Sequence, residues 1–274
     1  MLAFKSDKPA YRIFNTEGKD VKYGKMLEEM ETADVVFFGE LHNNPICHWL
    51  QIELTRDLYE KKDSAIMLGA EMFEADNQLI LNEYIEGKIS EKNYKKEAKL
   101  WPNYATDYAP LVEFAKEHQI PFIATNIPRR YASVVYSKGF EGLDSLSAEA
   151  RSYIAPLPVD YDPELKGYRS MLEEMEGMVH ANDNLPKAQA IKDATMAYSI
   201  AGALEKGTLF IHYNGTYHSN DYEGIIWYLN NYKPGLKIVS IASVEQEDIE
   251  NLEEEYKNKA DYIIVIPDRM TKTH

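Results

Sequence analysis

The hydrophobic positions of this chain fall in short, nearly uninterrupted runs. Near-continuous apolar runs are typical of strands that are buried on both faces, as in a parallel sheet. The pattern therefore predicts six strands of a mostly parallel sheet. The six runs, β-branched or aromatic in composition, are Val35–Phe38, Ala65–Leu68, Pro121–Ala124, Thr208–Ile211, Lys237–Ile241 and Tyr262–Ile266.

Between these runs, apolar residues recur at helical spacing. A long helix is expected over Lys187–Glu205, and Gly207, just after this range, is expected to end it. The repeated strand–helix–strand order predicts an α/β fold, with a mostly parallel central sheet flanked by helices. Two sets of residues share a helical face: Leu50, Leu54 and Leu58, and Leu111, Phe114, Ala115 and His118.

Two intervals between the predicted strands are longer than one crossover needs. They cover residues 75–119 and 128–207. We interpret both as helical insertions that form a small subdomain within a single α/β domain, residues 1–274. A chain of 274 residues is long enough to bury the core that such a domain needs.

The composition narrows the classes of function. The net charge is −15, and no basic cluster is longer than an adjacent pair, which argues against nucleic acid as a partner. The sequence contains no run of 18 or more apolar residues, so it predicts no transmembrane helix. The single cysteine, Cys47, excludes an internal disulfide. The first residues, "MLAFKSDKPAYRIF", lack the apolar core of a signal peptide, as in an exported protein from which the leader is absent.

Polar side chains follow four of the predicted strands, at the point where each strand ends. In an open α/β sheet, ligands bind in the crevice beyond the carboxyl ends of the strands. Any one of these residues is explained by the ordinary polarity of loops, but the coincidence over four strands predicts a polar pocket. In strand order they are Glu40 and His42, then Glu71, then Asn126, Arg129 and Arg130, then His212, Asn214 and His218.

These residue types suit several kinds of chemistry. Imidazole titrates near neutrality and binds borderline metals, and a nearby carboxylate raises its pKa or acts as a further ligand. Glu40, His42, Glu71 and His218 are therefore candidate ligands of a divalent metal. The arginine pair, 129 and 130, offers planar donors for a carboxylate or phosphate of the ligand.

A second set of residues is expected to support this pocket from behind: His212, Asn126, Gln189 and Asp193. Gln189 and Asp193 share a helical stripe with Met196 and Ile200, which either lines the pocket mouth or belongs to an ordinary packed helix. A turn at Asn214–Gly215 is expected to fold His218 back, so that it faces the same pocket as His42.

Five stretches of the chain resemble, in this order, the motifs of the ChaN-like haem-binding proteins. They are "GELHNNPICHWLQ", "GAEMFEADNQ", "TNIPRR", "AQAIKDATMA" and "NGTYHSN". The resemblance runs from about Ala33 to Ile266. This family is part of the wider Tiki/TraB/erythromycin-esterase-like superfamily.

The resemblance implies an exported bacterial protein of iron or haem uptake, periplasmic or membrane-anchored through a lipid. It also implies haem bound at a homodimer interface through a tyrosine, but none of the 20 tyrosines can be matched to that ligand. No lipobox cysteine precedes the domain. In hydrolytic relatives, the positions matching Glu40, His42, Glu71, Arg129 and His218 look catalytic or metal-binding.

Two functions therefore stand side by side. The first is a haem or iron-ligand binding protein, with the Glu/His/Arg pocket at the carboxyl edge of the sheet. The alternative is a hydrolase, metal-dependent or metal-free, in which a histidine or glutamate of the same pocket activates water. The residues give stronger support to the existence of the pocket than to either of these two functions.

Overall fold

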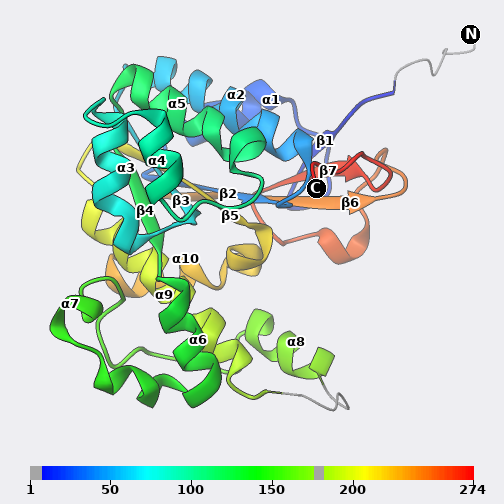
Figure 1. Ribbon diagram of the computed structural model, residues 1–274. Helices are drawn as coiled ribbons and strands as arrows, with labels where there is room; N and C mark the ends of the chain where they lie inside the picture. The colour runs from blue at the N-terminus through cyan, green and yellow to red at the C-terminus, as the bar shows by residue number, and fades with distance from the viewer. Residues whose placement is uncertain (1–7, 176–181) are drawn as a thin grey trace, which may run out of the picture.

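The computed structural model describes residues 8–175 and 182–274, and these form a seven-stranded sheet (Figure 1). The strand order is β1-β7-β6-β2-β5-β3-β4. Every neighbouring pair is parallel except β1 and β7. The predicted α/β class is therefore confirmed. The strands are β1 (Arg12–Asn15), β2 (Val35–Glu40), β3 (Ile66–Glu74), β4 (Phe122–Asn126), β5 (Leu209–Gly215), β6 (Ile238–Gln246) and β7 (Tyr262–Pro267).

All six predicted strands are present, but several continue further than the apolar pattern. β3 runs on to Glu74, so Glu71 lies inside this strand rather than after it. β5 runs on to Gly215, so the turn predicted at Asn214–Gly215 is wrong. β5 lies between β2 and β3, and its pairing with β2 continues to the Glu40–Gly215 pair. The chain reverses instead in the 3₁₀ turn η4 (Thr216–His218).

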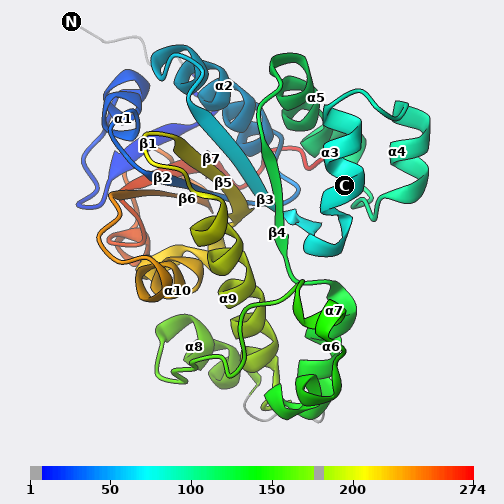
Figure 2. The same cartoon turned by 90° about the vertical axis from the view of Figure 1, so that its left-hand side faces the viewer.

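Helices cover both faces of the sheet (Figures 1 and 2). In both views α1, α2 and α5 lie on one face, whereas α9 and α10 lie on the other. The predicted long helix is α9, and it runs from Leu185, with Pro186 in its first turn, to Ala203. The helices are α1 (Tyr23–Met30), α2 (Pro45–Lys61), α3 (Gln78–Ile85), α4 (Glu91–Glu97), α5 (Ala109–His118), α6 (Arg129–Lys138), α7 (Ala148–Arg151), α8 (Lys166–Met175), α9 (Leu185–Ala203) and α10 (Ile225–Tyr232).

The alternation of side chains along the central strand β2 divides the core into two layers. Val36 and Phe38 pack into the cluster that contains the buried side of α2, including Leu50. Val35 and Phe37 pack into the cluster on the opposite face. Because successive side chains of a strand point to opposite faces, a strand covered on both sides is apolar at every position.

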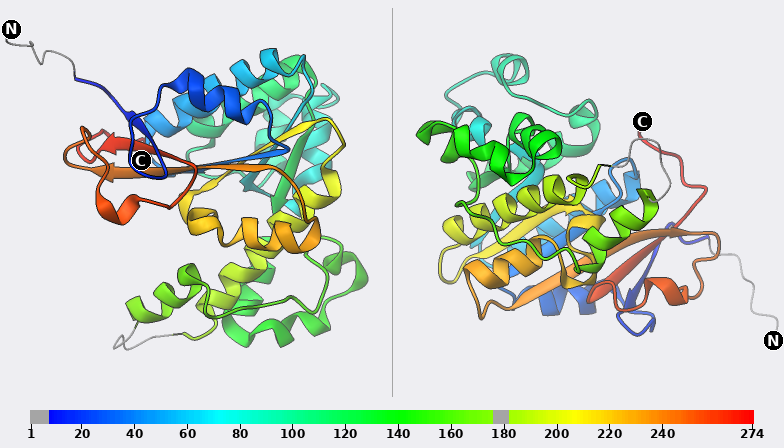
Figure 3. Two further views of the ribbon diagram at one scale, coloured as in Figure 1. Left: turned by 180° about the vertical axis from the view of Figure 1, so that it is seen from behind. Right: turned by 90° about the horizontal axis from the view of Figure 1, so that it is seen from below.

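The two long intervals are helical. The first holds α3, α4 and α5 beside β4. The second holds α6, α7 and α8 before α9, and these helices lie beyond the α9 side of the sheet (Figure 3). Part of this second interval has its own apolar cluster, which includes Val135, Leu143 and Ile191. Among the described residues, no helix is both long and apolar enough to cross a membrane.

Candidate functional site

The carboxyl ends of β2 and β5 and the adjoining part of β3 carry a buried cluster of carboxylates and imidazoles. Glu40 is the last residue of β2 and pairs in register with Gly215 at the end of β5. The backbone N–H of Gly215 donates a hydrogen bond of 2.8 Å to Glu71 Oε2, a carboxylate of β3. Glu40 and Glu71, which lie far apart in the sequence, are thus held on either side of one strand end.

Glu40 is fully buried and is held by donors from several elements. His42 Nδ1 lies 2.8 Å from Glu40 Oε1, and the Tyr108 hydroxyl donates to the same oxygen over 2.7 Å. The Gln51 amide donates to Oε2. His48 lies 3.7 Å from this carboxylate on one side and 3.4 Å from the Asp107 carboxylate on the other. Burial of this carboxyl group is tolerated because its oxygens accept these hydrogen bonds.

His42 projects from this buried base toward solvent. Its side chain is 37% exposed, and its ring packs edge-on against Trp101 with centroids 5.0 Å apart. Burial lowers the pKa of His42, but the hydrogen bond to Glu40 and the charges of Glu71 and Glu40 outweigh burial, so the pKa lies above its usual value. Because Nδ1 is held by Glu40, Nε2 is the nitrogen that His42 presents to a ligand.

His218 lies between two buried carboxylates. Nε2 is 3.1 Å from Glu71 Oε1, and Nδ1 is hydrogen-bonded to Asp193 of α9. The Tyr168 hydroxyl donates to the other oxygen of Asp193 over 2.7 Å. Ionised carboxylates can only accept hydrogen bonds, so both ring nitrogens of His218 donate and the ring is an imidazolium.

The pKa values follow from this arrangement. Burial lowers the pKa of His218, but the charges of Glu71 and Asp193 dominate and raise it well above the usual value. Burial raises the pKa of Glu71, but the charges of His218 and His42 and the Gly215 N–H hold it well below its usual range. Each ion pair therefore keeps its charges at neutral pH.

Gly215 allows the two imidazole–carboxylate pairs to approach each other. A Cβ atom on this residue would lie 2.7 Å from His42 Nε2 and 3.5 Å from Glu71 Oε2. The first distance is shorter than real Cβ contacts, so a side chain here would displace His42. Glycine is therefore required by close packing, since the backbone at Gly215 has a negative φ.

The residues predicted to support the pocket lie close to this cluster. His212 is fully buried, with Nε2 2.8 Å from Thr125 Oγ1 and Nδ1 3.0 Å from Asn214 Oδ1. Burial lowers the pKa of His212 to about 4, so this ring is neutral. The Asn126 amide donates to the Glu71 carbonyl over 2.9 Å, and the Gln189 amide lies 2.9 Å from His218 Nε2.

The four candidate metal ligands are not arranged as a metal site. Within residues 8–175 and 182–274, no group of three or more His, Cys, Asp or Glu side chains could hold a metal ion. The reason lies in the pairing: His218 uses both nitrogens, and His42 uses one, to donate to carboxylates. A nitrogen that carries a proton has no lone pair for a metal.

A recess of about 430 Å³ opens beside the cluster. Glu71 and Asn126 line it from the sheet, Arg129 from the start of α6, and Lys192 from α9. This volume is within the range of roughly 300–1,000 Å³ that is usual for ligand sites. The other lining residues are mostly apolar or aromatic: Glu74, Trp101, Ile127, Ala132, Ser133, Tyr136, Leu185 and Ala188.

The two adjacent arginines predicted for the pocket diverge. Arg129 lines the recess and has no ion-pair partner in the described part of the chain. Arg130 is paired with Asp76, its guanidinium lies over the Tyr131 ring, and it lines a neighbouring recess. Consecutive residues of a helix point about 100° apart, so one of the two turns away.

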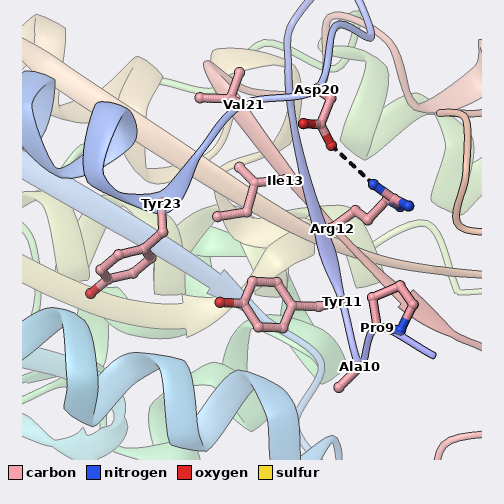
Figure 4. A pocket seen from close by; sticks show the side chains of 8 residues that line it. All are labelled: Pro9, Ala10, Tyr11, Arg12, Ile13, Asp20, Val21 and Tyr23. Atoms are coloured by element: carbon pink, nitrogen blue, oxygen red, sulfur yellow. Dashed lines mark hydrogen bonds and ion pairs between the residues drawn. The ribbon is translucent and has the colours of Figure 1, made fainter. Parts of the chain in front are cut away.

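A second large recess lies away from the cluster, beside β1 at the edge of the sheet (Figure 4). It measures about 480 Å³ and is lined by Tyr11 and Tyr23 among others. Its cationic residue, Arg12, is paired with Asp20 and Glu250 at 3.5 and 3.0 Å. None of its lining residues belongs to the carboxylate–imidazole cluster, whereas Glu71 of that cluster lines the recess at Arg129. The recess at Arg129 is therefore the better candidate for a functional site.

Several residues of the site were missed in the sequence. They come from positions that no strand end marks, so the pattern of polar residues after strands could not find them. Two carried a weak signal, since Gln51 and Lys192 lie inside the quoted motifs. The missed residues are Gln51, Trp101, Tyr108, Tyr136, Tyr168 and Lys192.

Comparison with known proteins gives a consistent result. The structure titled cofacial heme binding to ChaN of Campylobacter jejuni matches with a TM-score of 0.71 and 19% identity, over 93% of this chain and 96% of that one. This match shows the shared fold. A mutant of the erythromycin esterase EreC in its open conformation, 10% identical over 94% of this chain and 83% of that one with a TM-score of 0.49, is too distant to inform function.

Two sequence comparisons complete the picture. Protein RETICULATA-RELATED 5, chloroplastic, of Arabidopsis thaliana is 27% identical over 145 residues, which is 51% of this chain but only 19% of that protein. The family described as haem-binding uptake, Tiki superfamily, ChaN matches residues 26–229. That match spans four of the seven strands, β2 to β5, and every residue of the buried cluster. The chain therefore belongs to the ChaN family of haem-binding uptake proteins in the Tiki superfamily.

Proposed function

We propose that this protein binds haem in the recess beside the His42 and His218 cluster. The observation that carries the proposal is the family match over residues 26–229. The residues of the recess fit such a ligand: Trp101, Tyr136 and Leu185 offer apolar and aromatic surface for a flat ring, and Arg129 and Lys192 offer positive charge. Haem supplies the iron, and the chain supplies the walls.

Tyr136 is the tyrosine that lines the recess, and its side chain is 43% exposed. A tyrosine oxygen is a known ligand of ferric haem iron. The imidazoles are less suited, since His218 is held by carboxylates on both sides and His42 is not among the residues that line the recess. Tyr136 is therefore the residue that would hold the iron, and Trp101 would offer apolar surface to the ring.

A haem titration followed by the Soret band tests this proposal. We expect the unaltered chain to bind ferric haem, and Tyr136→Phe to shift the Soret and charge-transfer bands because the oxygen ligand is lost. Tyr198→Phe is the matched control, because Tyr198 is 45% exposed but lies on α9 outside the recess. An unchanged spectrum in Tyr136→Phe would exclude Tyr136 as the ligand. A wild-type chain that produces no Soret change would refute haem binding.

Two broader roles, which the resemblance of the sequence motifs implies, belong to the same proposal. The protein would act in bacterial haem uptake as an exported protein, periplasmic or lipid-anchored, and two copies would enclose the ligand as a homodimer. Fractionation of cells that make the native gene product tests the first role, and a cytosolic protein would contradict it. Mass measurement with and without haem tests the second.

One observation favours a second candidate, a metal-free hydrolase. Glu40 holds Nδ1 of His42, and Nε2 faces the Gly215 backbone at the mouth of the cluster. In this arrangement Nε2 can take a proton from water as the water oxygen attacks an ester carbonyl, while Glu40 stabilises the imidazolium that forms. The Arg129 guanidinium would then stabilise the developing oxyanion.

A panel of activated esters tests this candidate. Hydrolysis by the unaltered chain should be lost in His42→Ala and retained in His118→Ala, an exposed histidine on α5. Because the pKa of His42 is raised and the neutral ring is the base, the rate should rise with pH through that pKa. Equal hydrolysis by both variants would remove His42 from the mechanism.

A further inference from the structure

We infer that the recess recognises its ligand through the carboxylates of the ligand more than through its iron, so that metal-free porphyrins with free carboxylates are also ligands. This inference rests on the haem binding proposed above and goes beyond it, because it names the chemical class that the site accepts. The class is a flat, apolar macrocycle that carries carboxylate side chains, with or without a metal.

The charges that line the recess are the first step. Its two carboxylates are already neutralised inside the protein: Glu71 by His218 at 3.1 Å, and Glu74 by Lys99 at 3.2 Å. Its two cations, Arg129 and Lys192, have no carboxylate partner among the described ion pairs. The recess therefore has a net positive charge, although the chain as a whole carries −15.

Cations that have no carboxylate partner within the described part of so acidic a chain indicate an anionic ligand. Arginine presents planar donors that match a carboxylate in two-point contact. The guanidinium comes from the first residue of α6 and the ammonium from α9, so the two charges reach the recess from different helices. One ligand that carries two separate carboxylates is complementary to this arrangement.

The groups available to iron are the second step. The Gln189 amide lies within 3.1 Å of both His218 nitrogens, which are already held by Glu71 and Asp193. Glu71 also accepts from the Gly215 backbone, so its oxygens are occupied. Of the residues that line the recess, this leaves the half-exposed Tyr136 hydroxyl for the metal. One ligand bond to iron adds to the affinity, whereas the apolar walls and the two cations act on any porphyrin with free carboxylates.

Three ligands separate these contributions: ferric protoporphyrin, metal-free protoporphyrin, and the dimethyl ester of the metal-free ring. We expect the first two to bind the unaltered chain within about tenfold of each other, because both rings meet the same apolar walls and the same two cations, and the ferric ring gains only the one bond from Tyr136. Blocking the carboxylates should weaken binding by about 10- to 100-fold, the usual effect of losing hydrogen bonds to charged groups. Quenching of tryptophan fluorescence reports all three ligands, since Trp101 lines the recess.

Substitutions locate the effect. Arg129→Ala and Lys192→Ala should each weaken the metal-free and the ferric ring by the same factor, about 10-fold, and leave the ester unaffected. Arg130→Ala is the matched control, because this arginine is the next residue of the helix but is paired with Asp76 outside the recess. Urea unfolding of each variant shows whether the fold is intact.

The outcomes distinguish this inference from the proposed function. If ferric protoporphyrin binds and the metal-free ring binds more than 100-fold more weakly, the inference is wrong while haem binding stands. If the ester binds as tightly as the free acid, the inference is also wrong, since the carboxylates are then not recognised. If none of the three ligands binds, the proposed function fails together with the inference.

Discussion

At the scale of single residues, His218 couples the buried cluster to pH. Its two carboxylate partners raise its pKa in the folded chain, whereas in the unfolded chain the ring returns to about 6.5. Below that value both states carry the proton, and the ion pairs contribute fully to stability. Above it only the folded state keeps the proton, so the free energy of unfolding falls as the pH rises.

Replacing His218 with glutamine should remove this dependence. For the unaltered chain we expect the free energy of unfolding in urea to fall by up to about 1.4 kcal/mol per pH unit above pH ~7. His218→Gln should have a flatter profile and a stability lower by about 3–5 kcal/mol, because two buried carboxylates lose their partner. His118→Gln, on the surface of α5, should keep the wild-type slope. An equally steep profile in His218→Gln would assign the titration to another group.

Gly215 is the residue whose replacement most directly disturbs the cluster. In Gly215→Ala the added methyl group would lie 2.7 Å from His42 Nε2. We expect a loss of about 1–3 kcal/mol in the free energy of unfolding, as for other overpacked sites. The NMR signals of the His42 ring should also shift, because its hydrogen bond to Glu40 is disturbed.

Gly202→Ala is the matched control for this change. A Cβ on Gly202 meets no atom within 4 Å, and the residue lies near the end of α9. Alanine is favoured over glycine within a helix, so this variant should gain about 0.5–1 kcal/mol. If both glycine variants have the same stability as the unaltered chain, close packing at Gly215 is not a constraint.

At the scale of elements, the outer edge of the sheet at β4 is covered by a side chain. The Gln78 amide donates to the Phe122 carbonyl over 2.9 Å and accepts from the Ala124 N–H over 2.7 Å. No strand of residues 8–175 and 182–274 lies next to β4 on this side. The Gln78 side chain therefore makes the two hydrogen bonds that a neighbouring strand would make with Phe122 and Ala124. These two backbone groups are then not available to pair with another chain.

Gln78→Ala should uncover this edge. We expect a loss of about 1–3 kcal/mol in the free energy of unfolding, because two backbone groups lose their partners. Light scattering should also show more self-association with rising protein concentration. Gln78→Glu keeps the acceptor for the Ala124 N–H but loses the donor to the Phe122 carbonyl. Its free energy of unfolding should therefore lie between those of the unaltered chain and Gln78→Ala. A monomeric and fully stable Gln78→Ala would show that the edge needs no cover.

The elements were largely predictable from the sequence because burial on both faces leaves a clear pattern. Val35–Phe38 is such a case, since its side chains enter two apolar layers. β1 was missed because only Ile13 and Phe14 of its four residues are buried, too few for a recognisable run. The ends of β3 and β5 were misplaced because pairing with neighbouring strands extends them through polar residues such as Glu71 and His212.

At the scale of the whole molecule, the contacts within the candidate site could not be predicted. The order of the predicted strands was enough to predict which polar residues lie near the carboxyl edge of the sheet. The pairing was not, because the Glu71–Gly215 bond joins residues 144 positions apart, and the Tyr108–Glu40 bond joins residues 68 apart. Which nitrogen meets which oxygen depends on packing, and no local pattern encodes that.

The charge of the whole molecule also affects how an anionic ligand arrives. A net charge of −15 repels a dicarboxylate at long range, whereas the two cations of the recess attract it at short range. At about 10 mM salt the screening length is about 30 Å, and at 150 mM it is about 8 Å. Added salt therefore reduces the repulsion from the whole chain more than it reduces the contact attraction.

We expect the association rate of haem, measured by stopped flow, to rise several-fold between these two salt concentrations. In Arg129→Ala the rise should be larger, because one of the attracting charges is lost. An association rate that falls with added salt would mean that the cations of the recess, and not the net charge, govern the approach of the ligand.

The position of β5 has a consequence for the newly made chain. β5 lies between β2 and β3, although both precede it by more than a hundred residues. While the ribosome is still making the helices before residue 209, these two strands have no partner between them, and their facing backbone groups are unpaired. Unpaired strand edges are prone to association with other chains, and the long helical interval prolongs the time during which these edges are exposed. The buried cluster cannot form before residue 218 has been made, because Gly215 and His218 both belong to it.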